Sequence, residues 1–103
     1  MTRFQQVASV GDLAPGEKKI VEVDGILVVL VNCAGQYHAV EDVCTHDGGP
    51  LGEGTLENCQ LVCPRHGGRF DVLTGAALKL PAVDAVPTYE VRVQDGEVLV
   101  AVM

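Results

Sequence analysis

This chain of 103 residues is long enough, and with 48% hydrophobic residues apolar enough, to fill one core of ordinary size without disulfides. Seven basic and 14 acidic residues give a net charge of −7, which argues against nucleic acid as a partner and favours basic protein surfaces. Apolar runs such as Ile26–Val31 are far shorter than the ~20 residues that cross a bilayer, and Met1–Val7 lacks the apolar region of a signal peptide. We therefore expect a cytoplasmic protein with no membrane segment.

Short valine-rich segments alternate with turn dipeptides along the chain. Lys18–Val23 alternates with period two, and the dipeptide Asp24-Gly25 that follows it is typical of a tight hairpin. Ile26–Val31 is apolar throughout, so this segment is expected to be buried on both faces. The strands that we expect are Phe4–Ser9, Lys18–Val23, Ile26–Asn32, Gln36–Glu41, Gln60–Cys63, Arg69–Asp71, Ala76–Leu80, Thr88–Gln94 and Glu97–Val102.

The connections between these segments are short. Leu56–Asn58 is expected to form a turn, and Val10–Leu13 at most one turn of helix; no other segment has a helical pattern. Short strands at regular spacing predict an all-β fold, either a sandwich or a barrel.

Two glycine-rich stretches each combine one cysteine with one histidine. The first reads C-T-H from Cys44 to His46, and the second reads C-P-R-H from Cys63 to His66. Two thiolates and two imidazoles satisfy either a tetrahedral zinc ion or a [2Fe–2S] cluster. Zinc sites of this composition usually pair Cys with Cys and His with His. The mixed pairs found here favour the cluster, because each loop can then supply one ligand to each iron.

The residues around these ligands suit close approach of backbone to sulfur. Gly48, Gly49, Gly67 and Gly68 allow N–H groups to reach the sulfurs and tolerate positive φ angles. Pro64 fixes its own φ and stiffens the second loop.

The stretches C-T-H-D-G-G-P-L-G-E-G and C-P-R-H-G-G-R-F-D resemble the two cluster-binding boxes of Rieske-type ferredoxins. Residues 74–100, with T-G, L-P and P-T-Y-E-V-R-V-Q-D-G-E-V-L-V, also resemble the rest of that family. The resemblance implies a single Rieske domain spanning residues 1–103, whose base is an antiparallel β-sandwich or barrel built from both ends of the chain. It also implies a small inserted cluster-binding subdomain at about residues 42–80, in which the Leu80-Pro81 loop covers a third side of the cluster.

The same resemblance implies a function. The chain would carry one Rieske [2Fe–2S] cluster on Cys44, His46, Cys63 and His66 and act as a one-electron carrier. Its partners would be a flavin-dependent ferredoxin reductase upstream and a terminal non-heme iron oxygenase downstream. Two alternatives stay open: the small Rieske subunit of an assimilatory nitrite reductase-like enzyme, and a structural zinc module.

Four positions differ from the Rieske proteins of quinol-oxidising complexes. Gly49 and Arg65 stand where those proteins have bridging cysteines, and Gly68 and Phe70 where they have Ser and Tyr hydroxyls. Both differences point to the low-potential class that serves oxygenases. We therefore expect a reduction potential near the low end of the Rieske range of about −150 to +300 mV.

An oxygenase centre cannot be built from what remains. A mononuclear iron site of that kind needs two further histidines and a carboxylate, and only His38 is left. His38 is expected to be a surface or packed residue of a strand. We therefore expect an electron-transfer component rather than an enzyme.

Cys33 and Cys59 lie outside both boxes, each close to a turn. We expect them to be free thiols, with a disulfide between them or a regulatory thiol as the alternatives.

Overall fold

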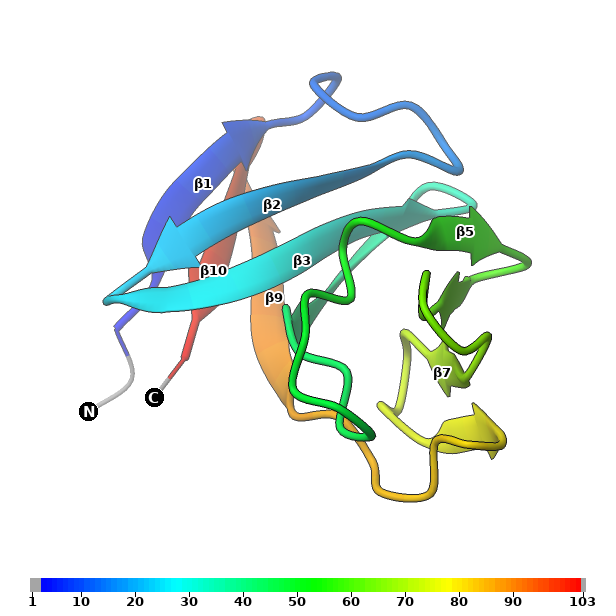
Figure 1. Ribbon diagram of the computed structural model, residues 1–103. Helices are drawn as coiled ribbons and strands as arrows, with labels where there is room; N and C mark the ends of the chain where they lie inside the picture. Colours follow the sequence, from blue (N-terminus) through cyan, green and yellow to red (C-terminus); the bar gives the residue numbers. More distant parts are fainter. Residues whose placement is uncertain (1–2, 103) are drawn as a thin grey trace.

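The computed structural model describes residues 3–102, which form ten strands and no helix. The first sheet is antiparallel and six-stranded, in the order β1-β10-β9-β4-β3-β2, and it curls until β1 and β2 come into contact (Figure 1). Its strands are β1 (Gln5–Ser9), β2 (Lys18–Val23), β3 (Ile26–Cys33), β4 (Gln36–Glu41), β9 (Thr88–Gln94) and β10 (Glu97–Ala101). The all-β prediction is confirmed.

The second sheet is small and comes from the middle of the chain. Its four antiparallel strands follow one another in the order β5-β6-β7-β8, and in Figure 1 they lie beside β3 of the first sheet. They are β5 (Thr55–Glu57), β6 (Gln60–Val62), β7 (Arg69–Asp71) and β8 (Ala77–Lys79).

One local expectation is partly wrong. Of the segment expected to turn, Leu56–Asn58, the residues Leu56 and Glu57 belong to β5, which pairs Leu56 with Leu61 of β6. The turn itself is Asn58-Cys59, where both residues have positive φ angles of 51° and 62°. The segment Val10–Leu13 forms a turn and a bend without helix.

Strand β3 is buried on both faces, as expected, because it lies between two cores. Val28 and Leu30 belong to the core inside the first sheet, whereas Val29 and Val31 belong to the core between the two sheets. Successive side chains of a strand point to opposite faces, so one strand supplies both cores. The strand is exposed near its beginning, where the side chain of Leu27 is 52% exposed.

Cys33 and Cys59 form a disulfide, so the expectation of two free thiols is wrong. Cys33 ends β3, and Cys59 lies in the turn that joins β5 to β6. Their Cα atoms are 5.5 Å apart, within the range that a disulfide requires. The bond joins the two sheets at a point that sequence spacing could not reveal.

Among residues 3–102, no helix is present that has the length and apolar character needed to cross a bilayer.

Candidate metal centre

The first ligand loop follows β4 and closes on itself through backbone hydrogen bonds. The N–H of Cys44 donates to the carbonyl of Gly49 at 2.7 Å, and the N–H of Gly48 donates back to the carbonyl of Cys44 at 2.7 Å. Gly48 has a φ of 78°, which a residue with a side chain rarely adopts.

The second ligand loop, between β6 and β7, has the same hydrogen-bond pattern. Cys63 N–H donates to the Gly68 carbonyl at 2.8 Å, and Gly67 N–H donates to the Cys63 carbonyl at 3.0 Å. Gly67 has a φ of 76°. The two loops are therefore structural equivalents, with Cys44 corresponding to Cys63.

Only half of the glycine prediction is confirmed, because Gly49 and Gly68 do not have positive φ angles. They lack side chains for reasons of space. A Cβ at Gly68 would lie 3.0 Å from the Cβ of Ala82, and a Cβ at Gly49 would overlap the guanidinium of Arg65.

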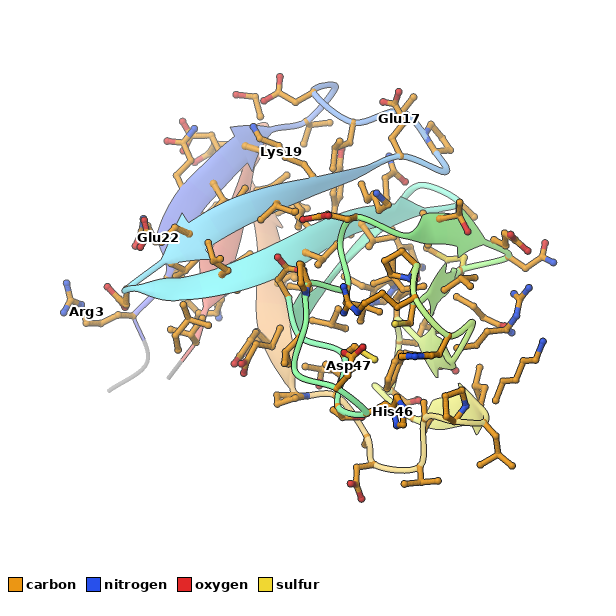
Figure 2. All side chains as sticks on the ribbon, in the orientation of Figure 1. Arg3, Glu17, Lys19, Glu22, His46 and Asp47 are labelled. Carbon is orange, nitrogen blue, oxygen red and sulfur yellow. A yellow bond between two sulfur atoms is a disulfide. The ribbon has the colours of Figure 1, made fainter. Side chains whose placement is uncertain are left out.

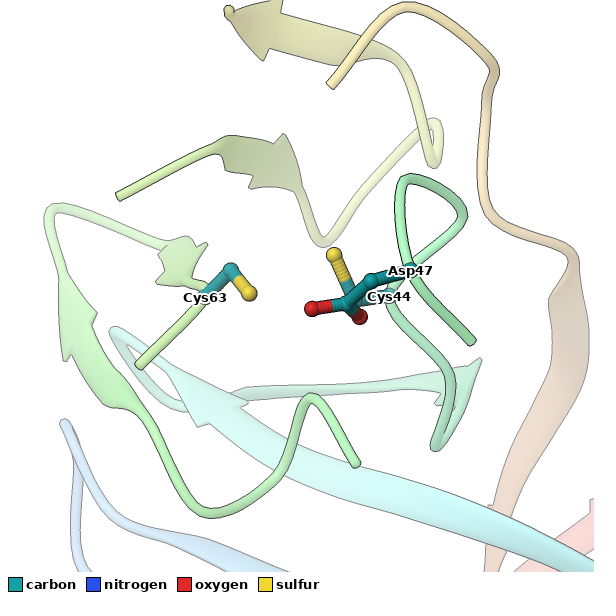
Figure 3. A group of neighbouring side chains, drawn as sticks. All are labelled: Cys44, Asp47 and Cys63. Carbon is teal, nitrogen blue, oxygen red and sulfur yellow. The ribbon is translucent and has the colours of Figure 1, made fainter. Parts of the chain in front are cut away.

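The two sulfurs are buried between the loops. Cys44 is 1% exposed and Cys63 is 2% exposed, and their side chains face the same space (Figure 3). Two backbone N–H groups point at each sulfur. Those of His46 and Asp47 point at Cys44, and those of Arg65 and His66 point at Cys63.

The surroundings affect the two thiols differently. Burial raises the pKa of Cys44, and the hydrogen bond with the Cys63 thiol raises it further. Burial also opposes ionisation of Cys63, but the N–H groups of Arg65 and His66 and the Cys44 thiol together hold the pKa of Cys63 below its ordinary value. Of the two thiols, Cys63 is therefore the one whose surroundings favour the thiolate, the form that binds a metal.

His46 and His66 lie at the open side of the loops, and both are exposed. Their ring centroids are 5.1 Å apart and the rings are nearly perpendicular, at 87°. Figure 2 shows His46 and Asp47 on the side of the molecule that carries the second sheet, away from Arg3 and Glu22. The structure thus brings all four predicted site residues to one end, with thiols inside and imidazoles outside.

Asp47 and Arg65 also lie at the site, beside the four residues predicted from the sequence. The carboxylate of Asp47 lies within 4.8 Å of both cysteine sulfurs, which makes these three residues the one potential metal-binding group of this kind in the described part of the chain. Asp47 also accepts hydrogen bonds from Arg65, and these hold the pKa of its carboxyl well below the usual range. The signal was present as an acid after C-T-H and a base before the second histidine.

A third segment, residues 80–86, closes the site beside the two loops. The hydroxyl of Thr45 donates to the carbonyl of Asp84 at 2.6 Å, and Ala82 packs against Gly68. The Leu80-Pro81 bond in this segment is cis. His38, by contrast, lies in β4 with its Nε2 atom buried and without a hydrogen-bond partner.

Two soft thiols and two borderline imidazoles, with backbone donors around the sulfurs, fit a thiolate-bound iron or zinc centre and do not resemble the all-oxygen sites of Mg²⁺ or Ca²⁺. Because each loop supplies one donor of each kind, the set divides naturally between two metal ions.

The comparisons with known proteins agree with this geometry. The Rieske [2Fe-2S] domain family matches residues 3–90. The ferredoxin component of a naphthalene 1,2-dioxygenase system from Pseudomonas putida is 33% identical over 98 residues, which cover 95% of this chain and 94% of the relative.

Two solved structures are similar over nearly the whole chain. The ferredoxin of carbazole 1,9a-dioxygenase from Nocardioides aromaticivorans has a TM-score of 0.91 at 37% identity and covers 95% of this chain and 96% of its own. A chain in a complex of reduced oxygenase and oxidised ferredoxin of carbazole 1,9a-dioxygenase has a TM-score of 0.91 at 36% identity. The match covers 95% of this chain and 92% of that one. Small subunits of nitrite reductases share the fold at lower identities of 26% and 19%.

Proposed function

Because the chain belongs to the Rieske [2Fe–2S] domain family, we propose that Cys44 and Cys63 bind one iron of its cluster and His46 and His66 the other. The chain is a ferredoxin that carries one such cluster and transfers electrons, rather than an enzyme that converts a substrate. When bound, the cluster supplies a centre that accepts and releases one electron.

The observation that carries the ligand assignment is the equivalence of the two loops. Each presents its cysteine sulfur to the buried space and aims two backbone N–H groups at that sulfur. Such donors favour a negatively charged thiolate, the form of cysteine that binds iron. The two imidazoles complete the set at the exposed side.

Electrons would enter and leave through the exposed histidine edges. The side chain of His66 is 51% exposed, and apolar residues of the 80–86 segment lie near this end, with Leu80 72% and Val83 70% exposed. We propose that this surface, the histidine end, contacts the redox partners in turn. An exposed apolar surface beside a redox centre lets a partner exclude water and approach closely.

The proposed partners are a flavin-dependent ferredoxin reductase and a terminal non-heme iron oxygenase. Support for the second comes from a similar chain in a solved complex of oxygenase and ferredoxin of carbazole 1,9a-dioxygenase. The named sequence relatives are ferredoxin components of dioxygenase systems. The alternative of a nitrite reductase subunit has the support of structural neighbours at lower identity alone. Co-purification with a large subunit would favour that alternative.

The proposal extends to organisation and location. We infer a single Rieske domain over residues 1–103, with a cluster-binding subdomain at about 42–80; the strands of the second sheet, 55–79, fall within that segment. We also infer a cytoplasmic location, which cell fractionation would test.

The test of this function is electron transfer by ligand variants. His66→Ala and His46→Ala should lose the cluster or hold it weakly, and reduction of the oxygenase by the reductase should then stop. His38→Ala is the matched control, because it removes an imidazole from β4 and should leave both cluster content and electron transfer unchanged. Full activity of both ligand variants would overturn the assignment.

A further inference from the structure

We propose that Arg65 and Asp47 form a clamp that fixes the two ligand loops to each other and thereby retains the cluster. They would be positioning residues, and the inference rests on the ligand set proposed above. The guanidinium of Arg65 donates from Nε to Oδ2 of Asp47 at 2.6 Å and from Nη2 to Oδ1 at 3.0 Å. This two-pronged pair joins the loop after β6 to the loop after β4.

The carboxylate is held in place by its own loop as well. Oδ1 of Asp47 accepts a third hydrogen bond, from the N–H of Gly49 at 2.9 Å. The side chains of Asp47 and Arg65 are 22% and 38% exposed. Isolated surface ion pairs contribute little to stability, but a bidentate pair with a fixed carboxylate is the geometry in which they do contribute.

The arginine is also packed against the opposite loop. A Cβ placed on Gly49 would overlap the guanidinium, so the absence of a side chain at that position provides the space that Arg65 occupies. Each half of the clamp therefore depends on the other loop: the base on the space at Gly49, and the acid on the fork of Arg65.

The clamp occupies the positions that the ligands leave free. In the equivalent loops, the second residue after cysteine is His46 in one and Arg65 in the other, and the third is Asp47 in one and His66 in the other. Two of these four positions bind metal under the proposed function, and the other two bind each other. Oδ2 of Asp47 is 3.5 Å from Nδ1 of His66, so the clamp also touches a ligand.

The experiment measures cluster loss from the purified holoprotein, followed as bleaching of the visible absorption in the presence of a chelator. Arg65→Gln and Asp47→Asn should each bleach about tenfold faster, the change that a barrier lower by about 1.4 kcal/mol produces. Combined, they should bleach no faster than either alone, because one interaction is being removed. Arg65→Lys keeps the charge without the fork, so it should recover only part of the loss.

The matched control is Arg69→Gln. It breaks a second arginine–carboxylate pair, between Arg69 of β7 and Glu57 of β5 at 3.0 Å, which lies outside the ligand loops. It should bleach at the wild-type rate. The reduction potential is a second readout: Asp47→Asn should raise it and Arg65→Gln should lower it, because each leaves an unpaired charge near the cluster. A purely structural defect would not produce opposite signs.

The outcomes separate the clamp from the ligand assignment. If wild-type protein contains the cluster and the clamp variants bleach at its rate, the clamp is overturned while the assignment stands. If wild-type protein contains no iron, the assignment fails by itself. Variants that keep their β-sheet circular dichroism but take up no cluster, while Arg69→Gln takes up its cluster, would support the clamp. A double variant whose bleaching is accelerated by the product of the two single effects, about a hundredfold, would overturn it.

Discussion

Each cysteine of the site combines burial with backbone donors, and these two influences shift the pKa of its thiol in opposite directions. Burial alone keeps a thiol neutral, whereas N–H groups aimed at the sulfur favour the thiolate. Burial opposes ionisation of Cys63, but the donors of Arg65 and His66 and the Cys44 thiol together lower its pKa; at Cys44, burial and the hydrogen bond with Cys63 raise the pKa. With two thiolates and neutral histidines, an oxidised [2Fe–2S] centre has no net charge, so it accepts an electron more easily than one with four thiolates.

The same reasoning predicts the effect of a hydroxyl near the sulfurs. Phe70 is fully buried in the core that also contains Cys44 and Cys63. A donor here stabilises the reduced state more than the oxidised one. At about 1 kcal/mol of differential stabilisation and ~59 mV per tenfold change, Phe70→Tyr should raise the reduction potential by about 40 mV.

Spectroelectrochemical titration of the intact holoprotein checks this value. Phe4→Tyr makes the same chemical change in a residue whose ring contacts Arg92 of β9, and it should leave the potential unchanged. Adding Gly68→Ser is less informative, because a Cβ there meets Ala82. A Phe70→Tyr protein with a full cluster and an unchanged or lower potential would contradict the explanation from missing hydroxyls.

Among the elements, those governed by local chemistry were predictable. Asp24-Gly25 and Asp95-Gly96 form turns with two positive φ angles, the conformation that these dipeptides favour, and the strands on either side follow the expected bounds closely. Asn58-Cys59 forms the same kind of turn, but cysteine is no signal for it. The strand before that turn was therefore missed.

Contacts between distant segments were not predictable from pattern. The disulfide between Cys33 and Cys59 and the pair between Asp47 and Arg65 depend on how the second sheet packs against the first, which no local spacing encodes. The four ligands were predictable because their chemistry is unusual in itself. Free cysteines and charged residues are common, so their partners appear only in the folded chain.

The disulfide provides a prediction at the level of the two sheets. It closes a loop with a sequence separation of 26, so its removal should lower the free energy of unfolding by about 3.5 kcal/mol. Cys33→Ser combined with Cys59→Ser should show this loss in urea unfolding of the non-reduced protein.

Reduction of the wild-type bond should give a similar loss, and the double variant should not respond to the reductant. Thiol titration of denatured, metal-free wild-type protein should find two free thiols, those of Cys44 and Cys63. Four free thiols, or equal stabilities of the oxidised and reduced forms, would contradict the structural role of the bond.

Two features of the whole molecule bear on partner binding: the exposed histidine end and the negative net charge. The histidine end exposes imidazole edges and apolar side chains, while the chain as a whole carries a net charge of −7. Under the proposed function the two features would act together: the net charge would guide the encounter with a basic partner, and the histidine end would then make the short-range contact.

Electrostatic guidance predicts a dependence on salt. The rate of electron transfer from the reductase, at limiting protein concentration, should fall as ionic strength rises, since the Debye length shortens from ~10 Å at 0.1 M to ~3 Å at 1 M. Stopped-flow reduction across this range measures it, with an uncharged small-molecule reductant as the control. A rate that stays constant would contradict steering by charge.

The metal content of the protein distinguishes a cluster from zinc most directly: iron, acid-labile sulfide and zinc are measured in protein isolated freshly and without oxygen. We expect two irons and two sulfides per chain, together with the visible absorption of a cluster bound by two thiolates and two imidazoles. Stoichiometric zinc in place of iron and sulfide would contradict it.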